Sequence, residues 1–220
     1  MRTTKSSRGG DDLPAWNLPE AVVRQVAVSA FDNRCYLLTC KSTGEQLLVD
    51  AADDARRIMG MVAEGGDGLS WIVTTHCHKD HFQALAELLG ATGACSAAGR
   101  PDAEALPVFP DLLLDHGDEL RIGALTLQVV HLRGHTPGSL ALVLRSGSGQ
   151  CVAFTGDSLF PGGVGNTGGS PERFTTLFQD VQDRLFGVLP DDTLVLPGHG
   201  KHTTLGAERP HLAQWRARGW

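Results

Sequence analysis

The sequence predicts an α+β fold in which two sheets pack together and helices cover the outer face of each sheet. Two patterns predict it: short apolar segments of strand length recur along most of the chain, and each half also contains a helical pattern. Elements of this kind bury their apolar faces by packing in layers. The 220 residues, 41% of them hydrophobic and 20% charged, suffice for one globular domain with a sizeable core.

The first half of the chain supplies three strands and a helix. Residues 1–20 are polar and punctuated by glycine and proline, so we expect a flexible N-terminal arm before a single domain at 21–220. Asp53 is expected to cap a helix that ends at Gly65-Gly66. The strands expected from β-branched and apolar residues span 21–29, 35–39 and 46–50.

The second half is expected to consist mainly of strands, with one long helix at 172–189 and a short helix near the C-terminus. Its expected strands span 112–114, 119–122, 125–130, 140–144, 151–155 and 193–196.

A dense group of polar side chains follows the apolar run at 69–73. His76, His78, Asp80 and His81 fall within six positions, where a strand should end and a helix begin. Chemistry in α/β proteins usually sits at the carboxyl ends of strands, and neutral imidazole is the commonest metal ligand. In an extended segment, His76 and His78 point the same way, so this loop can offer two ligand pairs. We interpret it as a metal site.

Asp80 also has a structural interpretation. With Gln83 three residues later, it would complete a capping box for a helix from 82 to 89 that ends at Gly90. One residue can both cap and ligate, so both roles stay open. Cys77 alternates with the two histidines and is expected to point away from them into the core.

Three later segments share one layout, an apolar strand ending in a turn of small residues that carries one metal-ligand side chain. These side chains are His135, Asp157 and His199. Each has a glycine as its neighbour, which fits a crowded loop where backbone must approach closely. Three such turns after the dense histidine group predict one shared site.

Together these segments resemble the motifs of the metallo-β-lactamase superfamily, and within it the glyoxalase II-like hydrolases. The resemblance implies a four-layer αββα sandwich that holds two divalent metal ions, with zinc favoured and iron or manganese as alternatives. The motifs are H-x-H-x-D-H at 76–81, G-H-T-P-G-S at 134–139, T-G-D-S-L-F at 155–160 and P-G-H-G at 197–200.

By position, the resemblance assigns seven ligands to the two metals. Asp157 would bridge them, so Asp80 and Asp157 are the carboxylates implied at the reacting centre. Asp50, at the end of a strand, matches a family aspartate that orients ligands, although a strand-ending cap is an alternative. The implied ligands are His76, His78 and His135 for the first metal and Asp80, His81 and His199 for the second.

The resemblance implies hydrolysis of a thioester by a hydroxide that the two metals generate from water. The runner-up is a persulfide dioxygenase, which uses one iron held by two histidines and a carboxylate. Hydrolysis of another ester or a lactone, and a non-catalytic metal-binding module, are further alternatives. The chain ends soon after His199, so the resemblance does not assign glutathione as the thiol carrier.

The substrate is expected to be small and anionic, because two divalent ions outweigh the charge of their carboxylate ligands. Arg133, two residues before His135, is a candidate contact for a substrate carboxylate, with a plain surface arginine as the alternative. A net charge of -6 without a basic run argues against nucleic acid and anionic membranes as partners. Five cysteines without a C-x-x-C pair favour free thiols in the cytoplasm, and the oligomeric state, monomer or dimer, stays open.

The segment 163–168 formally matches the dinucleotide motif G-x-G-x-x-G. It lies well past its strand and opens no immediate helix, so we interpret residues 162–169 as a loop over the metal site instead.

Overall fold

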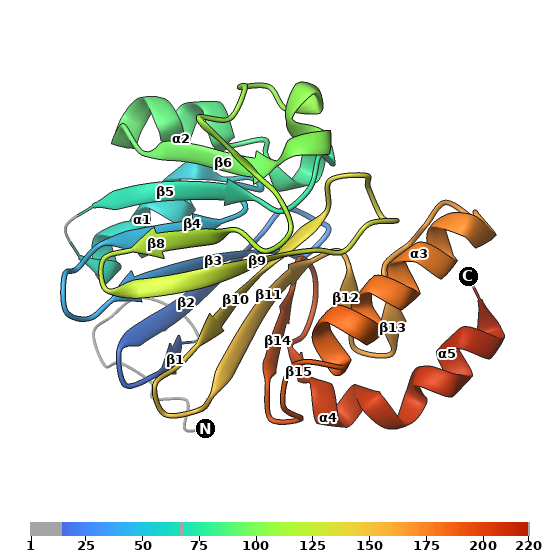
Figure 1. Ribbon diagram of the computed structural model, residues 1–220. Helices are drawn as coiled ribbons and strands as arrows, with labels where there is room; N and C mark the ends of the chain where they lie inside the picture. The colour runs from blue at the N-terminus through green and yellow to red at the C-terminus, as the bar shows by residue number, and fades with distance from the viewer. Residues whose placement is uncertain (1–14, 67, 220) are drawn as a thin grey trace.

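Two mixed sheets pack face to face, and helices cover the outer face of each sheet (Figure 1). The computed structural model describes residues 15–66 and 68–219. Within these residues, the first half of the chain forms a seven-stranded sheet and the second half a six-stranded sheet. The expected four-layer αββα sandwich is therefore confirmed.

The seven-stranded sheet follows the chain order from one edge to the other. It starts as an antiparallel meander and becomes parallel where helices provide the crossovers between strands. Its strands are β1 (Ala15–Asn17), β2 (Ala21–Val28), β3 (Asn33–Cys40), β4 (Gln46–Val49), β5 (Leu69–Thr74), β6 (Cys95–Gly99) and β7 (Leu112–Leu114), and its helices are α1 (Ala55–Gly65) and α2 (Leu85–Thr92).

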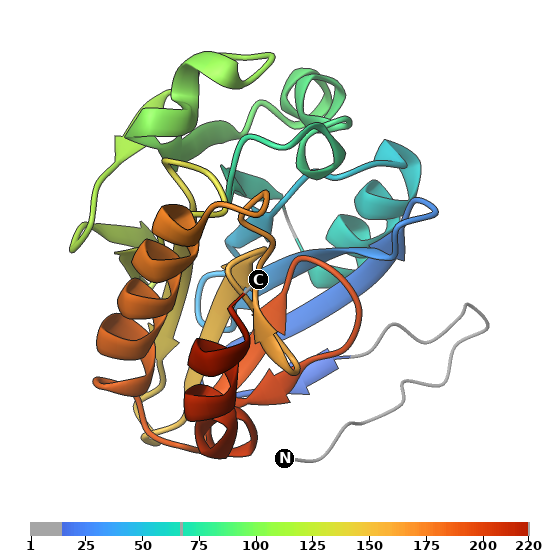
Figure 2. The ribbon, with the colours of Figure 1, turned by 90° about the vertical axis from the view of Figure 1, so that its right-hand side faces the viewer.

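The six-stranded sheet has the order β15-β14-β11-β10-β9-β8, formed by β8 (Glu119–Ile122), β9 (Leu125–His131), β10 (Leu140–Arg145), β11 (Cys151–Gly156), β14 (Leu194–Pro197) and β15 (Thr203–Thr204). A separate hairpin, β12 (Leu159–Phe160) and β13 (Gly163–Val164), follows β11. The covering helices are α3 (Pro171–Val181), which continues as a π-helical turn at Gln182–Phe186, α4 (Leu205–Glu208) and α5 (Leu212–Arg218). Figure 2 shows α3 and α5, in orange and red, on the opposite side of the molecule from α1.

Three apolar layers hold the sandwich together. The central layer lies between the sheets and includes Leu38 and Phe154, both fully buried. One outer layer packs Ile58 of α1 against Ile72 of β5. The other packs α3 and Trp215 of α5 against the second sheet. Burial of apolar area at about 25 cal/mol per Å² is the main force that fixes the two sheets relative to each other.

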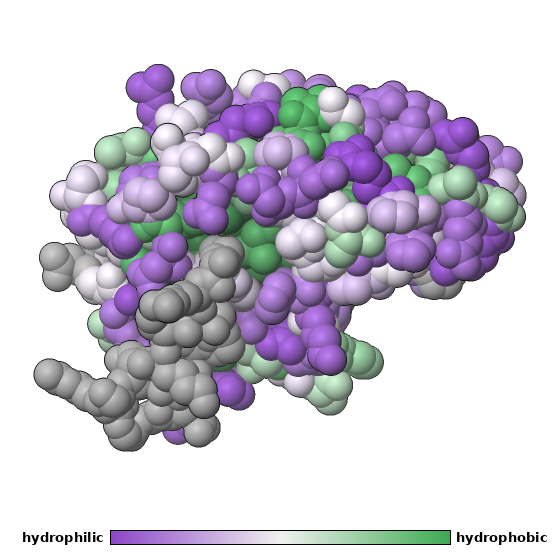
Figure 3. Space-filling view, turned by 90° about the horizontal axis from the view of Figure 1, so that it is seen from below, coloured by the Kyte–Doolittle hydropathy of each residue, from purple (hydrophilic) through white to green (hydrophobic). Residues whose placement is uncertain are grey.

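The described part of the chain contains no helix that is long and apolar enough to cross a membrane. The face shown in Figure 3 is mainly hydrophilic, with apolar side chains visible between polar ones.

The two sheets are joined by backbone hydrogen bonds at the edge where the ligand-bearing strands end. Leu140 N donates to Thr75 O at 3.0 Å, and Arg34 N donates to Gly198 O at 2.7 Å. Gly198 N also donates to Gly156 O at 2.8 Å, at the end of β11. These bonds bring the loops after β5, β9, β11 and β14 to one place.

The predicted N-terminal arm is wrong for residues 15–20; residues 1–14 lie outside the described part of the chain. β1 pairs antiparallel with β2, and Trp16 and Leu18 are buried between the sheets. Two large apolar side chains in a polar, glycine- and proline-punctuated stretch were enough to anchor an edge strand.

The start of α2 also differs from the prediction. Residues Lys79–His81 form a 3₁₀ turn, and α2 begins at Leu85 without a side-chain cap. The reason is local: Gln83 N and Ala84 N donate to the backbone carbonyls of residues 52 and 51, so this backbone is tied to the preceding loop. Asp80 therefore does not cap α2, and the helix ends at Gly93 (φ 68°) rather than at Gly90.

The cap of α1 lies one residue later than predicted. Asp54, at φ 44°, accepts a hydrogen bond from Arg57 N, whereas Asp53 accepts from Asp54 N. Either aspartate could serve as the cap on sequence grounds, since both precede the apolar helical pattern.

Replacement of Trp16 by alanine tests whether β1 belongs to the core. We expect the Trp16→Ala variant to lose about 3–5 kcal/mol of unfolding free energy, because a buried aromatic side chain is removed. Denaturant unfolding monitored by circular dichroism measures the loss. Phe109→Ala is the matched control, since Phe109 is 60% exposed. Equal stabilities of the two variants would contradict the packing of β1.

Candidate metal centre

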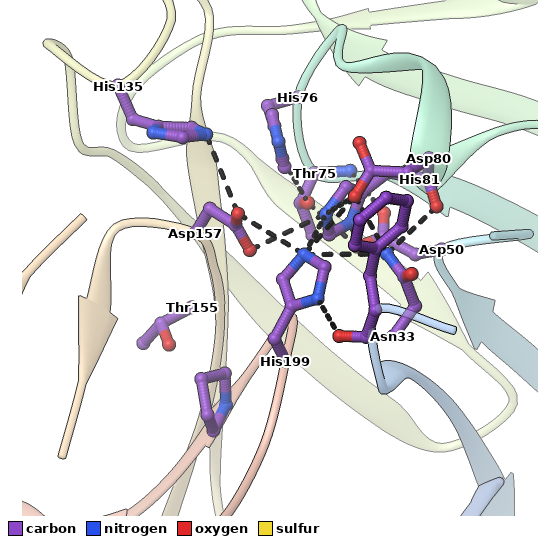
Figure 4. A network of polar contacts seen from close by, with 12 residues as sticks. Asn33, Asp50, Thr75, His76, Asp80, His81, His135, Thr155, Asp157 and His199 are labelled. Atoms are coloured by element: carbon purple, nitrogen blue, oxygen red, sulfur yellow. Dashed lines mark hydrogen bonds and ion pairs between the residues drawn. The ribbon is translucent and has the colours of Figure 1, made fainter. Parts of the chain in front are cut away.

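All seven predicted ligands converge at the edge where the two sheets meet. Figure 4 shows all of them except His78. The loop after β5 supplies four of them, and the strand ends of the second sheet supply the other three. The strands thus act as rigid supports, and each short loop projects its side chain into one common space. The loop after β5 carries His76, His78, Asp80 and His81, whereas His135, Asp157 and His199 follow β9, β11 and β14.

The first ligand group is formed by His76, His78 and His135. One ring nitrogen from each lies within 4.8 Å of the others. The rings of His76 and His78 are edge to face, with centroids 4.8 Å apart, and His78 and His135 are arranged similarly at 4.5 Å. His76 and His135 are buried and His78 is exposed, so one side of the group is open to solvent.

The second ligand group is formed by Asp80, His81 and His199. Nε2 of His81 lies 3.1 Å from Nε2 of His199, and Asp80 Oδ2 lies 3.6 and 3.3 Å from these two atoms. Tetrahedral zinc with bonds of about 2.0–2.1 Å places its ligand atoms about 3.3 Å apart. The separations in the second group therefore fit a metal ion at its centre.

Asp157 lies between the two groups. Its Oδ2 is 3.6 Å from His135 Nε2 of the first group and 3.4 Å from His199 Nε2 of the second, and its Oδ1 is 3.5 Å from His81 Nε2. Oδ1 of Asp157 and Nε2 of His76 and His135 are buried without a hydrogen-bond partner among the described residues. Buried polar atoms normally have a hydrogen-bond partner. These three atoms instead present lone pairs to one another, which is the arrangement expected of metal ligands.

Two ligand imidazoles, the buried His135 and the partly buried His199, are held from behind through their Nδ1 atoms. His135 Nδ1 donates to Asn166 O at 2.7 Å, and His199 Nδ1 donates to Phe31 O at 2.8 Å. Because a carbonyl oxygen can only accept, the proton of a neutral ring lies on Nδ1 and the lone pair of Nε2 faces the centre. This tautomer is the one that a metal requires of a ligand bound through Nε2.

Asp50 performs the same task for His81 and, through Thr75, for His76. Asp50 Oδ2 accepts from His81 Nδ1 at 2.9 Å and from Thr75 Oγ1 at 2.9 Å, and Asp50 Oδ1 accepts from Thr75 N at 2.7 Å. Since the Thr75 hydroxyl donates to Asp50, it accepts from His76 Nδ1, 3.0 Å away. These are the contacts that the ligand-orienting role implied by the resemblance requires, and that role stays a prediction for Asp50.

Asn33 is a supporting residue that the sequence did not single out. Its side chain is fully buried, and Nδ2 donates to Asp80 O at 2.9 Å and to Asp80 Oδ2 at 3.0 Å. Ser29 Oγ donates to Asn33 Oδ1 and fixes the amide. No pattern in the sequence indicates that Asn33 reaches Asp80, 47 positions away.

The two groups differ in electrostatics. Burial, followed by the neighbouring histidines, lowers the pKa of His76 well below its ordinary value, and burial lowers the pKa of His135. Burial also opposes protonation of His199, but the carboxylates of Asp157 and Asp80 prevail and raise its pKa to about 9. His76 and His135 therefore favour the neutral form that a metal ligand needs, whereas the carboxylates around His199 favour a cation there.

Arg133 has a partner other than the one considered from the sequence. Arg133 Nε and Nη2 donate to the two carboxylate oxygens of Asp180, both at 2.9 Å, and Asp180 belongs to α3. Arg173 of α3 donates to Gly134 O and His135 O. These bonds hold the His135 loop against α3, so the geometry gives Arg133 a structural role.

At two positions the backbone lies so close to the ligands that only glycine fits. A Cβ atom on Gly198 would lie 2.3 Å from Asp157 Oδ1 and 2.6 Å from His81 Cε1. One on Gly165 would lie 1.7 Å from Asp157 O. Gly165 follows β13, so the segment 162–169 is partly a short hairpin that packs on the centre rather than only a loop above it.

Three open cavities of 640, 580 and 600 Å³ reach the centre. The largest runs along the β12–β13 hairpin to Asp157, and the others reach His78 and Asp80. Cys77 lines the second cavity and is only partly buried, so it is not the core residue that was expected. Burial and the Asp102 carboxylate raise the pKa of its thiol to about 11, which keeps it protonated.

Several sequence relatives match most of this chain, and two of them represent different activities. The chain is 36% identical over 170 residues to a hydroxyacylglutathione hydrolase of Fuscovulum blasticum, which covers 76% of this chain and 62% of that relative. It is 32% identical over 204 residues to the mitochondrial persulfide dioxygenase ETHE1 of Homo sapiens, which covers 91% of this chain and 74% of the relative. The chain thus spans less than two thirds of the length of the hydrolase.

Solved structures share the fold. ETHE1 from Myxococcus xanthus superposes with a TM-score of 0.76 at 30% identity, covering 89% of this chain and 84% of the other. A structure described as TTHA1623 in a di-iron-bound form has a TM-score of 0.68 at 31% identity, covering 84% and 96%. A family model described as the metallo-beta-lactamase superfamily matches residues 29–199. The chain therefore belongs to the metallo-β-lactamase superfamily.

Proposed function

We propose that this chain is a dinuclear metal-dependent hydrolase that cleaves the thioester bond of small anionic S-acyl thiols. The ligands proposed are His76, His78 and His135 at the first position and Asp80, His81 and His199 at the second, with Asp157 between them. Zinc is the proposed metal, and iron or manganese are the alternatives to be separated by experiment.

One observation supports the metal centre above the others. The Nε2 atoms of His81 and His199 are 3.1 Å apart, although both rings use Nδ1 for other hydrogen bonds. Two nitrogen lone pairs at this distance repel each other unless a proton or a metal cation lies between them. Asp80 and Asp157 place carboxylates beside both nitrogens, and this donor set suits a divalent ion such as zinc.

A pair of divalent ions at these positions would acidify a water molecule held between them and polarise a carbonyl oxygen. The protein's own contribution is orientation. Burial opposes the ionisation of Asp157, but His199 and the nearby histidines lower its pKa. Asp157 Oδ2 lies 3.6 Å from His135 Nε2 and 3.4 Å from His199 Nε2, so the carboxylate contacts both groups. Asn33 orients the Asp80 carboxylate, because Asn33 Nδ2 donates a hydrogen bond to Asp80 Oδ2.

Hydrolysis adds water across the acyl–sulfur bond and yields a carboxylic acid and a thiol. The leaving thiol has a pKa of about 8.5, so it departs as a thiolate without a dedicated general acid. The carbonyl oxygen and the leaving sulfur need separate space, and the three cavities around the centre provide it.

The preference for an anionic substrate is supported by the basic residues around the centre. Each of the three cavities contains one: Arg218 in the largest, Arg173 in the second and Lys79 in the third. A hydroxyacyl conjugate of a carboxylate-bearing thiol, as in the name of the hydrolase relative, has this charge. Five free cysteines agree with a reducing compartment, and we propose the cytoplasm.

A persulfide dioxygenase is the second candidate. The relative with this name aligns with 91% of the chain, more than the hydrolase does. His76, His135 and Asp157 would supply two histidines and a carboxylate, the set that non-haem iron oxygenases use. The two candidates differ in the number and identity of the metal ions.

Metal analysis combined with substrate screening tests the proposal. We expect about two zinc ions per chain by mass spectrometry, turnover of a small anionic S-acyl thiol, and loss of activity and of thermal stability on chelation, since an ion that binds only the folded chain stabilises it. One iron per chain with oxygen uptake on a persulfide would establish the second candidate instead. Absence of thioester turnover by the fully metallated protein contradicts the first.

The support that Asp50 gives to the ligands yields a second prediction. We expect Asp50→Asn to weaken zinc binding about 10- to 100-fold, because the carboxylate accepts hydrogen bonds with both oxygens whereas the amide has only one acceptor. Its NH2 group would face either Thr75 N or the donors on His81 and the Thr75 hydroxyl. Competition against a chromophoric chelator measures the affinity. Asp53→Asn is the control, since Asp53 accepts only a local backbone hydrogen bond; an equal effect of both substitutions would refute the role of Asp50.

A further inference from the structure

Asp102 is a buried carboxylate that belongs neither to the sequence motifs nor to the ligands. It lies in the 3₁₀ segment Arg100–Ala105, directly after β6, and is 2% exposed. An ionised carboxylate in such a position requires hydrogen bonds to offset its lost hydration. The groups that supply these bonds therefore show what Asp102 holds in place.

Three donors reach Asp102 from the two loops that carry the first ligand group. Cys77 N donates to Oδ2 at 3.0 Å, from the loop after β5. Thr136 Oγ1 donates to Oδ2 at 2.5 Å and Gly138 N donates to Oδ1 at 2.7 Å, from the loop after β9. Hydrogen bonds to an ionised acceptor are stronger than neutral ones, so Asp102 joins the loops firmly.

The donors lie directly beside the ligands. Cys77 stands between His76 and His78, and Thr136 follows His135, so every ligand of the first group is one residue from a donor to Asp102. His78 has no ring hydrogen bond among the described residues, which leaves its backbone as the main determinant of its direction. The ligands of the second group are held by Asp50, Asn33 and Phe31 instead.

The backbone and side chains around Asp102 are tightly packed. A Cβ atom on Gly138 would lie 2.7 Å from Asp102 Cγ, and one on Gly99 would lie 2.1 Å from Gly138 O. The Thr136 hydroxyl also meets Ser139 Oγ at 2.6 Å. A carboxylate that contacts both loops at such short range transmits the position of one loop to the other.

We infer that Asp102 is a positioning residue for the first metal position alone, and that it keeps His76 and His78 in register with His135. The inference rests on the dinuclear centre proposed above. Removal of Asp102 separates the two loops at the first group and leaves the second group intact. The zinc affinity of the first position then falls, while the zinc affinity of the second position is unchanged.

Paired ligand knockouts allow each position to be measured by itself. His199→Ala disables the second position and His78→Ala the first, and Asp102→Ala is placed in each background. Zinc affinity, measured by competition with a chromophoric chelator, should fall about 10- to 100-fold in the His199→Ala background. In the His78→Ala background it should change less than about twofold, the additivity expected of independent sites.

Two controls separate positioning from folding. Asp111→Ala removes a carboxylate that also accepts two hydrogen bonds near β6, both from Ser96, but contacts neither loop, so it should leave zinc affinity unchanged in both backgrounds. Asp102→Asn keeps the volume and serves if the alanine variant does not fold; it should give a smaller loss with the same selectivity, since its amide accepts from Gly138 N but not from Cys77 N.

Equal losses in both backgrounds, or a loss in neither, would overturn the inference. A wild-type chain that binds two zinc ions but hydrolyses no thioester would overturn the proposed reaction and leave the role of Asp102 standing. A wild-type chain that binds a single ion would overturn the dinuclear premise, and with it the assignment of Asp102 to one of two positions.

Discussion

The hydrogen bonds that converge on Asp50 connect the two ligand groups through a single buried carboxylate. One bond comes from His81 of the second group, and another comes from Thr75, whose hydroxyl in turn accepts from His76 of the first group. Asp50 adopts φ 60°, a conformation that non-glycine residues rarely take, and such strain is tolerated only where surrounding bonds over-determine it. Two rings from different groups are thereby fixed by the position of one side chain.

The centre also depends on the docking of the two sheets. Four ligands belong to the first sheet and three to the second, and each group contains residues from both. The central apolar layer determines the distance between the sheets, and the backbone bonds from Leu140 to Thr75 and from Arg34 to Gly198 determine their alignment at the edge. Folding and the formation of the ligand groups are therefore one event in this molecule, as they are in other proteins whose ligands come from distant segments.

Much of this could be predicted from the sequence, and the parts that could not have physical reasons. β9 and β10 were predicted because their apolar and β-branched residues match the strand pattern. β6 was missed because Cys95–Gly99 consists of small residues, which carry little strand signal yet suit a strand packed closely against Gly138. At the centre, the ligands were found from residue type and spacing. Asn33 and Asp102 were missed because a supporting side chain is defined by its partners, and these lie 47 and 25 to 36 positions away in the chain.

The glycine at 198 shows that the ligands are not the only residues with a fixed identity. Any side chain there would collide with Asp157 and His81 together, and so would disturb both ligand groups with one methyl group. In a saturation-mutagenesis map, Gly198 should therefore be as intolerant of substitution as the histidine beside it, although it has no side chain to offer as a ligand. Some positions of a metal-binding sequence motif are thus glycine because no side chain fits there. An engineer who transplants only the donor residues to another scaffold would omit the empty space that lets them meet.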